Sequence, residues 1–231
     1  MAGQAKAGKA FEYALLYTSY QILSNHHSAS IIQNSSYMVA QNYFNSCSPT
    51  EKNNYLCAAD KAINHIIILE PRLTNPIDKA DTLTLQLQSD NLGIKGDVRD
   101  VLFIKSSQSW EIGISAKNNH KAIKHSRLSP TIDFAKKWFG LNCSNKYWSA
   151  VKPIFGQLKI HQNNSVSWNS LQNKNQAIYL PLLIAFKDEV LLQHTNNPGK
   201  VPTLLLKYLL GIKDYYKVIK ESRNVTIIGF N

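Results

Sequence analysis

The sequence has little cysteine and no long apolar run. None of its three cysteines, Cys47, Cys57 and Cys143, stands at CxxC spacing from another, so neither a zinc knuckle nor a disulfide framework is predicted. The longest apolar run, residues 177–186, is about ten residues long, whereas a membrane-spanning helix needs about 20. The first residues show no apolar signal segment. We therefore expect a soluble protein in the reducing cytoplasm, with no membrane partner.

Acidic residues are scarce in one part of the chain. The 231 residues carry 26 Lys and Arg against 15 Asp and Glu, a net charge of +11. Residues 1–116 hold nine basic and ten acidic residues, whereas residues 117–174 hold ten basic residues and a single acid, Asp133. A solvated helical face normally mixes both signs. A block with almost no acids is typical of a surface that binds a polyanion, and we expect that partner to be nucleic acid.

The composition favours a folded protein of mixed class. Apolar residues make up 44% of the chain, which is enough to bury a core. No internal repeat and no long linker rich in Gly, Ser or Pro interrupts it, so one compact domain is expected over residues 1–231. Helical and strand patterns both occur, which predicts an α/β (α+β) domain with a helical N-terminal region ahead of a small central sheet.

Periodicity places the individual elements. Apolar residues at helical spacing predict a helix over residues 11–23. Ser129-Pro130 predicts the start of a helix that runs to about residue 139, where Gly140 ends it, and further helices are expected over residues 145–162, 176–194 and 202–210. The stretch Ser48-Pro49-Thr50-Glu51 predicts the start of another helix that runs to about residue 69. Alternating or β-branched runs predict strands over residues 82–88, 98–104, 110–117 and 225–230. The second and third of these strands are expected to pair as a hairpin.

That hairpin brings an acid and a lysine to one end. A turn centred near residue 107 places Asp97 opposite Lys117. Moving the centre by half a residue places Asp100 opposite Ser115 instead. In either register a carboxylate meets Lys117. The sequence leaves open which aspartate it is, although the apolar run that follows Asp100 favours Asp100.

An acid beside a lysine suits the hydrolysis of a phosphodiester. Carboxylates hold a hard divalent cation, usually Mg²⁺, which activates water and neutralises charge in the transition state. A lysine positions the nucleophile and stabilises the same charge. An ordinary surface hairpin has the same spacing of residues, and it is the basic block beginning at Lys117 that favours a nuclease. We therefore expect Asp97, Asp100 and Lys117 to be catalytic, with the two aspartates as metal ligands.

The hairpin resembles the core of the PD-(D/E)xK nucleases, with a departure at Ser115, where that core usually carries an acid. Glu111 does not replace it, because six strand residues at ~3.3 Å each put it about 20 Å from Lys117 unless a bulge shortens the strand. The resemblance implies that a helix supplies the missing carboxylate. Glu12, on the first expected helix, is the preferred catalytic residue and metal ligand, and Asp133 is the second choice.

A longer segment is similar to the HaeIII-type family of type II restriction endonucleases. The stretches that carry the resemblance are GDVRD at 96–100, WEIG at 110–113, KNNH at 117–120, KHSRL at 124–128 and DFAKKWFG at 133–140. The resemblance implies a restriction-endonuclease-like core with a small mixed sheet, a central hairpin and flanking helices. We expect residues 1–75 to form a mainly helical N-terminal part, residues 80–140 the catalytic core, and residues 141–231 a helical, basic C-terminal part.

The resemblance also implies an activity and its partners. These are Mg²⁺-dependent cleavage of double-stranded DNA at the palindrome GGCC, a homodimer that matches the two-fold symmetry of a palindrome, and a cognate DNA methyltransferase. Two other functions stay open on the residues alone. One is a DNA-binding protein without catalysis and without sequence preference, and the other is a repair nuclease that selects DNA structure.

DNA contacts are expected directly after Lys117. The candidates are the polar and basic residues Asn118, Asn119, His120, Lys121, Lys124, His125 and Arg127. Lysines hold phosphates, and Arg and Lys side chains bond the O6 and N7 atoms of guanine, which makes Lys124 and Arg127 the sharpest candidates for a GC-only site. The alternative is that these residues touch the DNA backbone alone.

Overall fold

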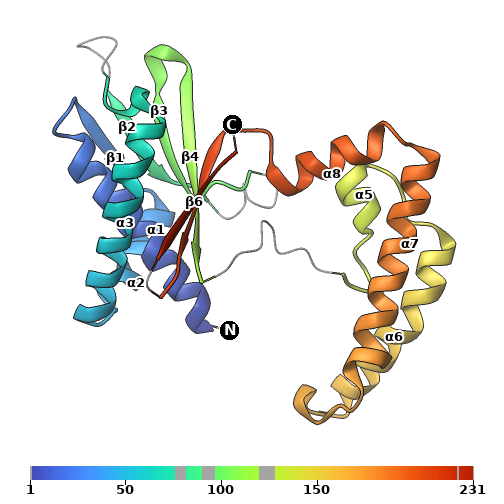
Figure 1. Ribbon diagram of the computed structural model, residues 1–231. Helices are drawn as coiled ribbons and strands as arrows, with labels where there is room; N and C mark the ends of the chain where they lie inside the picture. Colours follow the sequence, from blue (N-terminus) through green and yellow to red (C-terminus); the bar gives the residue numbers. More distant parts are fainter. Residues whose placement is uncertain (1, 76–81, 90–96, 120–127, 223, 231) are drawn as a thin grey trace. The chain divides into compact units, whose positions relative to one another are not determined.

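The computed structural model describes residues 2–75, 82–89, 97–119, 128–222 and 224–230, and for residues 2–4 the backbone alone. The chain divides into two compact units (Figure 1). The first is built from residues 1–123 and 210–231, and the second from residues 124–209. Each unit is described by itself.

A six-stranded mixed sheet forms the centre of the first unit (Figure 1). In spatial order its strands are β1 (Ala29–Ile32), β2 (Leu83–Leu87), β3 (Val101–Lys105), β4 (Trp110–Asn118), β5 (Tyr215–Lys220) and β6 (Val225–Phe230). The pairs β1–β2 and β4–β5 are parallel, and the other three pairs are antiparallel. The expected α/β class with a small mixed sheet and a central hairpin is confirmed.

Three helices lie on one face of this sheet: α1 (Ala2–Leu23), α2 (Ser35–Asn45) and α3 (Pro49–Leu69) (Figure 1). The expected capping box starts α3, because the Ser48 hydroxyl accepts from the Glu51 N–H while the Glu51 carboxylate accepts from the Ser48 N–H. A short 3₁₀ turn, η1 (Pro71–Leu73), follows α3. α1 packs on β2 and β4, and α3 packs on β5 and β6. Their apolar faces and the inner face of the sheet form one core.

Three elements of the first unit were not predicted from the sequence: β1, α2 and β5. β1 is four residues long, and it is held by its parallel pairing with β2, which is distant in sequence. β5 is buried on both faces, from Tyr215 to Ile219, and therefore shows no alternation of polar and apolar residues. α2 begins in a polar stretch at its cap residue Asn34, which accepts from the Tyr37 N–H. Tertiary packing rather than local pattern defines these elements.

The register of the β3–β4 hairpin decides between the two alignments left open by the sequence. Val101 lies opposite Ile114, and the Asp100 N–H donates to the Ile114 carbonyl at 2.7 Å. Asp100 therefore lies at the level of Ser115, as in the second alignment. The strands are joined by η2 (Ser106–Gln108) and by Ser109, which has a φ of 50°. Pairing continues without a bulge from Trp110 to Ile114, so Glu111 stays remote from Lys117 along the strand.

The second unit is helical. Its elements are α5 (Phe134–Phe139), α6 (Asn145–Asn163), the 3₁₀ turn η3 (Trp168–Ser170), the π-helical turn η4 (Asn175–Tyr179), α7 (Leu180–Asn196) and α8 (Lys200–Leu210). The helix expected from residue 129 was predicted too early. It starts at Phe134, because Asp133 is the residue that caps it by accepting from the Lys136 N–H, and Gly140 ends it in the left-handed conformation. None of the described helices is both long and apolar enough to cross a membrane.

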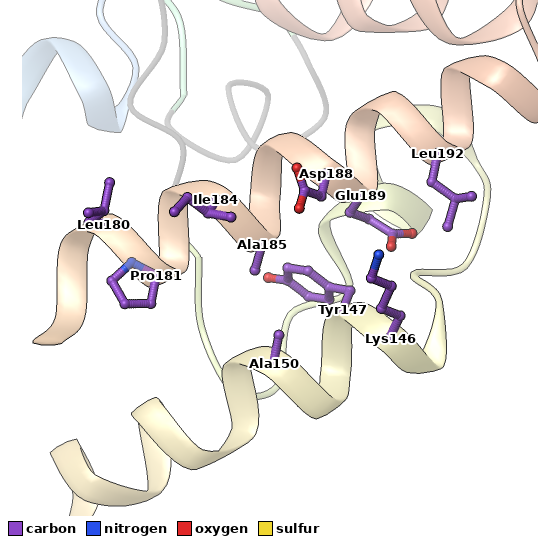
Figure 2. Close-up of a pocket in the computed structure, with 10 residues that line it drawn as sticks. All are labelled: Lys146, Tyr147, Ala150, Leu180, Pro181, Ile184, Ala185, Asp188, Glu189 and Leu192. Atoms are coloured by element: carbon purple, nitrogen blue, oxygen red, sulfur yellow. The ribbon is translucent and has the colours of Figure 1, made fainter. Parts of the chain in front are cut away.

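Aromatic residues hold this unit together. Phe134 contacts Trp138, Tyr147 and Phe186, with ring centroids 4.9–5.2 Å apart. α6 packs against α7, and a cavity of about 370 Å³ opens between them (Figure 2). Its walls are mainly apolar. Glu189 is one of the residues that line this cavity and is buried, and its carboxylate accepts from the N–H and the hydroxyl of Ser144 at 2.9 and 2.5 Å, which ties α7 to the start of α6.

Candidate active site

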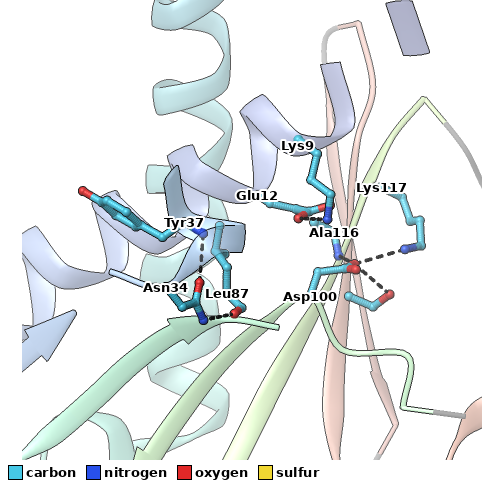
Figure 3. Close-up of polar contacts among 9 residues, drawn as sticks. Lys9, Glu12, Asn34, Tyr37, Leu87, Asp100, Ala116 and Lys117 are labelled. Carbon is cyan, nitrogen blue, oxygen red and sulfur yellow. Dashed lines mark hydrogen bonds and ion pairs between the residues drawn. The ribbon is translucent and has the colours of Figure 1, made fainter. Parts of the chain in front are cut away.

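Asp100 and Lys117 meet at one end of the hairpin (Figure 3). The Lys117 Nζ lies 3.1 Å from the Oδ2 atom of Asp100, and the Ala116 N–H donates to the same oxygen at 2.7 Å. The Ser115 hydroxyl lies 3.5 Å from it. Each side chain of the Asp100–Lys117 pair is about one quarter exposed. The strand pairing therefore holds a carboxylate in a fixed orientation while leaving it in reach of a ligand.

Glu12 approaches this pair from α1. Figure 3 shows the Lys9–Glu12 pair of α1 next to Asp100 and to Ala116 and Lys117 of β4. Glu12 lies in the middle of the apolar run 10–16 of α1, so the packing of that helix on the sheet carries its carboxylate inward to 7% exposure. Its Oε2 accepts from the Lys9 Nζ at 2.9 Å. Glu12 is the residue that the resemblance to the PD-(D/E)xK core singled out as the preferred source of the missing carboxylate.

The environment of Glu12 disfavours its charged form. Burial raises the pKa of Glu12 to about 8, with a further contribution from the negative charge of Asp100, and Lys9 and Lys117 oppose the shift. Two carboxylates that repel each other in a poorly hydrated place favour binding of a cation. Without a cation Glu12 is therefore mostly protonated near pH 7, and a cation bound between the two carboxylates would favour its ionised form.

The donor set fits a hard divalent cation. Mg²⁺ takes oxygen ligands and in proteins commonly uses one or two carboxylates, with water and substrate phosphate completing the octahedron. Glu12 of α1 and Asp100, which directly precedes β3, supply two carboxylates. Within the described part of the chain, His, Cys, Asp and Glu side chains form no group of three or more that would make a metal site of protein ligands alone. These residues fit a site that the phosphate of a substrate completes.

Asp97 lies in a different set of contacts. Its carboxylate accepts from Nε and Nη2 of Arg99 at 2.9 and 2.6 Å, and from the Arg99 N–H at 3.1 Å. Arg99 is 5% exposed and also pairs with Glu111 at 3.3 Å, and Lys213 joins Glu111 at 2.8 Å. Asp97 and Glu111 thus neutralise buried Arg99, which lies in the segment 97–100 that leads into β3 and that we call the strand-entry loop. Of the two aspartates in this loop, Asp100 is the one that contacts Lys117.

Gly113 makes room for that arginine. A Cβ atom at Gly113 would lie 2.4 Å from Cδ and 2.7 Å from Cγ of Arg99. The glycine is therefore required because the Arg99 side chain lies close to the backbone of β4. It does not mark a bulge, since the pairing of β3 with β4 is regular on both sides of Gly113. Arg99 in turn sits directly before Asp100, so this contact fixes the turn from which Asp100 projects.

Lys217 was missed by the sequence patterns. It lies on β5 in register with Ser115 and is 2% exposed. Burial lowers the pKa of Lys217, and the charge of Lys117 lowers it further. Residues paired in register share one face of a sheet, which places this lysine beside the position where the usual acid is replaced by serine. No local signal identified it, because β5 itself was not predicted.

The other candidates have contacts of their own. Asp133 caps α5 in the second unit, and both of its oxygens accept from the Cys143 N–H at 3.1 Å, so its carboxylate has a structural function there. Asn118 ends β4, and the Asn119 N–H donates to the Lys220 carbonyl at 2.7 Å. The other expected DNA contacts, His120, Lys121, Lys124, His125 and Arg127, lie outside the described residues.

The sequence of this chain matches a known protein family. The family model described as HaeIII restriction endonuclease matches residues 8–231. The type II restriction enzyme HaeIII of Haemophilus aegyptius is 38% identical over 226 residues, which are 97% of this chain and 70% of that enzyme. No solved structure matches. The resemblance read from residues 96–140 is confirmed across nearly the whole chain. The chain belongs to the HaeIII restriction endonuclease family and is a type II restriction endonuclease that acts on double-stranded DNA.

Proposed function

We propose that the chain hydrolyses DNA phosphodiester bonds in a Mg²⁺-dependent reaction centred on Glu12, Asp100 and Lys117. The observation that carries the proposal is that buried Glu12 of α1 lies close enough to Asp100 and Lys117 to interact electrostatically with both. Glu12 can therefore supply the carboxylate that is missing at Ser115. Glu12 and Asp100 are the proposed metal ligands. When bound, the ion supplies charge neutralisation at the phosphate and lowers the pKa of a bound water.

The residues of the chain have separate tasks in this proposal. Asp100 is oriented by the Ala116 N–H, so one of its oxygens is fixed before any ligand arrives. Lys117 holds the attacking water or a phosphate oxygen and stabilises the negative charge of the transition state. Arg99, locked by Asp97 and Glu111, holds the turn at Asp100. We assign Asp97 to this supporting contact rather than to the metal.

The proposed recognition site is the palindrome GGCC, which the family resemblance implies. A palindrome suits a homodimer whose two-fold axis coincides with that of the DNA site. A cell that contains such an enzyme must protect its own sites, so a cognate DNA methyltransferase is the proposed partner. Asn118, Asn119 and the basic residues between positions 120 and 127 are the proposed DNA contacts next to Lys117.

Digestion of plasmid DNA in the presence of Mg²⁺ tests the function. Discrete fragments whose ends map to GGCC are expected, and none in EDTA. Lys117→Ala should cut about 100-fold more slowly or worse while it still binds DNA, because the charged group leaves the reacting centre but the basic surface stays. Lys187→Ala, at an exposed lysine on α7, is the matched control and should cut like the wild type.

Three outcomes would oppose the proposal. Binding without any cutting would indicate a DNA-binding protein, and cutting only at junctions or damaged sites would indicate a repair nuclease. Full activity of Lys117→Ala would remove the hairpin from the reaction.

A further inference from the structure

One face of α6 carries polar, basic and small residues and no acid. At successive spacings of four and three residues it presents Asn145, Ser149, Lys152, Gly156, Lys159 and Asn163, and all six are exposed. Residues at this spacing lie in a row along one side of a helix. The opposite side, with Tyr147 and Val151, is buried in the core of the second unit. We call this row the α6 polar face.

The charge around the α6 polar face is positive. The second unit has three acids in its described part, and two of them are turned to the backbone: Asp133 accepts from the Cys143 N–H, and Glu189 accepts from the Ser144 N–H. Asp188 is the remaining, exposed acid. Lys187 lies 3.5 Å from Asp188 and offsets its charge, and seven further lysines of the unit are exposed, at positions 136, 137, 146, 152, 159, 200 and 207. The described surface of the second unit therefore carries an excess of positive charge, which suits a phosphate backbone.

Gly156 is a residue type that destabilises a helix at the position it occupies. It lies in the middle of a 19-residue helix, where glycine is the least favourable residue after proline. A Cβ atom at Gly156 would have no neighbour within 4 Å, so packing inside the chain does not require a glycine there. Lys152 lies four residues before it and Lys159 three residues after it on the same face. A side-chain-free position between two lysines lets the surface of another molecule approach the helix backbone.

We propose that α6 is the helix that enters the major groove of the DNA, with the α6 polar face toward the base edges and Gly156 at the point of closest approach. The inference rests on the DNA-cutting function proposed above. The major groove is wide enough for an α-helix, and Lys and Asn side chains bond base edges there. The row from Asn145 to Asn163 is about 27 Å long at 1.5 Å per residue. Lys152 and Lys159 are assigned to guanine edges or to the adjacent phosphates.

Equilibrium binding without metal tests this inference apart from catalysis. Fluorescence anisotropy with a labelled duplex that contains GGCC, and with one that does not, gives Kd at several salt concentrations. Lys152→Ala and Lys159→Ala should each raise Kd for the GGCC duplex about tenfold. A lysine that binds phosphate also lowers the salt slope by about 1 and affects both duplexes, whereas one that reads guanine affects the GGCC duplex alone. Lys187→Ala is the control and should leave Kd within about twofold.

Gly156→Ala separates a DNA-contacting role from a structural one. The melting temperature of the variant should rise, because alanine favours the helix, whereas its Kd for the GGCC duplex should rise about tenfold because the methyl group obstructs the approach. Unchanged binding by this variant, or lysine variants that behave like Lys187→Ala, would overturn the inference. These outcomes are independent of the proposed catalysis, since a wild-type protein that binds but never cuts would contradict the active site and leave the α6 results standing.

Discussion

At the scale of single residues, the two aspartates of the strand-entry loop have different neighbours and should respond differently to substitution. Asp100 meets Lys117, and Asp97 meets Arg99. Asp100→Asn should therefore reduce the rate of DNA cleavage about 100-fold or more. Asp97→Asn should retain cleavage when folded but should lower the free energy of unfolding by about 2 kcal/mol, because a buried cation loses its strongest partner. Single-turnover cleavage and urea unfolding of both variants measure the two effects.

Equal loss of cleavage in both variants, without loss of stability in Asp97→Asn, would contradict this division of roles.

The Asp97–Arg99 pair also predicts a pH dependence of stability. Burial by itself raises the pKa of Asp97, but the hydrogen bonds and charge of Arg99 outweigh it, so the pKa is lowered from its ordinary value of 3.8. A carboxyl with a lowered folded pKa stabilises the protein above its unfolded pKa, and that stability is lost as the pH falls through the folded pKa. The wild type should therefore lose more stability below about pH 4 than Asp97→Asn does. Urea unfolding of both proteins from pH 6 to pH 3 measures the difference, and parallel curves would argue against the pair.

Two glycines give a matched test of close packing. Gly113→Ala should destabilise the protein by about 1–3 kcal/mol, because the new Cβ would lie 2.4 Å from Cδ of buried Arg99. Gly8→Ala in α1 is the control, since a Cβ there has no neighbour within 4 Å and alanine favours a helix. Thermal unfolding of the two variants should move in opposite directions. A shift of the same sign in both would show that Gly113 is not required by the arginine.

At the scale of elements, local signals decided which features were predictable. The β3–β4 hairpin and the α3 cap were visible because alternation, a turn and a capping box are encoded within a few residues. Glu12 became a candidate through the resemblance to the PD-(D/E)xK core, in which a helix supplies a carboxylate, together with the helix expected over residues 11–23. Lys217 was not visible, because its position depends on the parallel pairing of β5 with β4, whose paired residues lie more than 100 positions apart in the chain. The onset of α5 was misplaced because Ser129-Pro130 offered a competing start signal upstream of the Asp133 cap.

The tie between α6 and α7 yields a prediction at the same scale. Glu189 is 3% exposed and accepts from Ser144 and Gln193. Glu189→Ala should destabilise the protein by about 3 kcal/mol, because the N–H and hydroxyl of Ser144 and the Gln193 amide lose their acceptor. Chemical unfolding measures the loss. Asp188→Ala, at the neighbouring exposed acid, is the control and should cost less than about 0.5 kcal/mol. Similar losses in both would indicate that the tie contributes little.

At the scale of the whole molecule, the sequence predicted the class of partner better than the details of contact. The family was identifiable from stretches within residues 96–140, and charge segregation indicated a polyanion independently of it. The division into two compact units was not predictable, because no linker composition marks the boundary near residue 124 or near residue 209. Fold class and hairpin chemistry are local properties of the sequence, whereas the meeting of α1, β3 and β4 at one site depends on tertiary packing.

In the proposed reaction, Glu12 completes the metal site that Ser115 leaves short of a carboxylate. The most direct measurement is the cleavage rate of a GGCC duplex at saturating enzyme as a function of Mg²⁺ concentration, for Glu12→Gln and Asp133→Asn beside the wild type. Glu12→Gln should cut about 100-fold more slowly or worse at every Mg²⁺ concentration while binding DNA normally. Asp133→Asn should cut like the wild type, because asparagine also caps a helix. Wild-type cutting by Glu12→Gln, or loss of cutting in Asp133→Asn alone, would show that Glu12 is not the missing metal ligand.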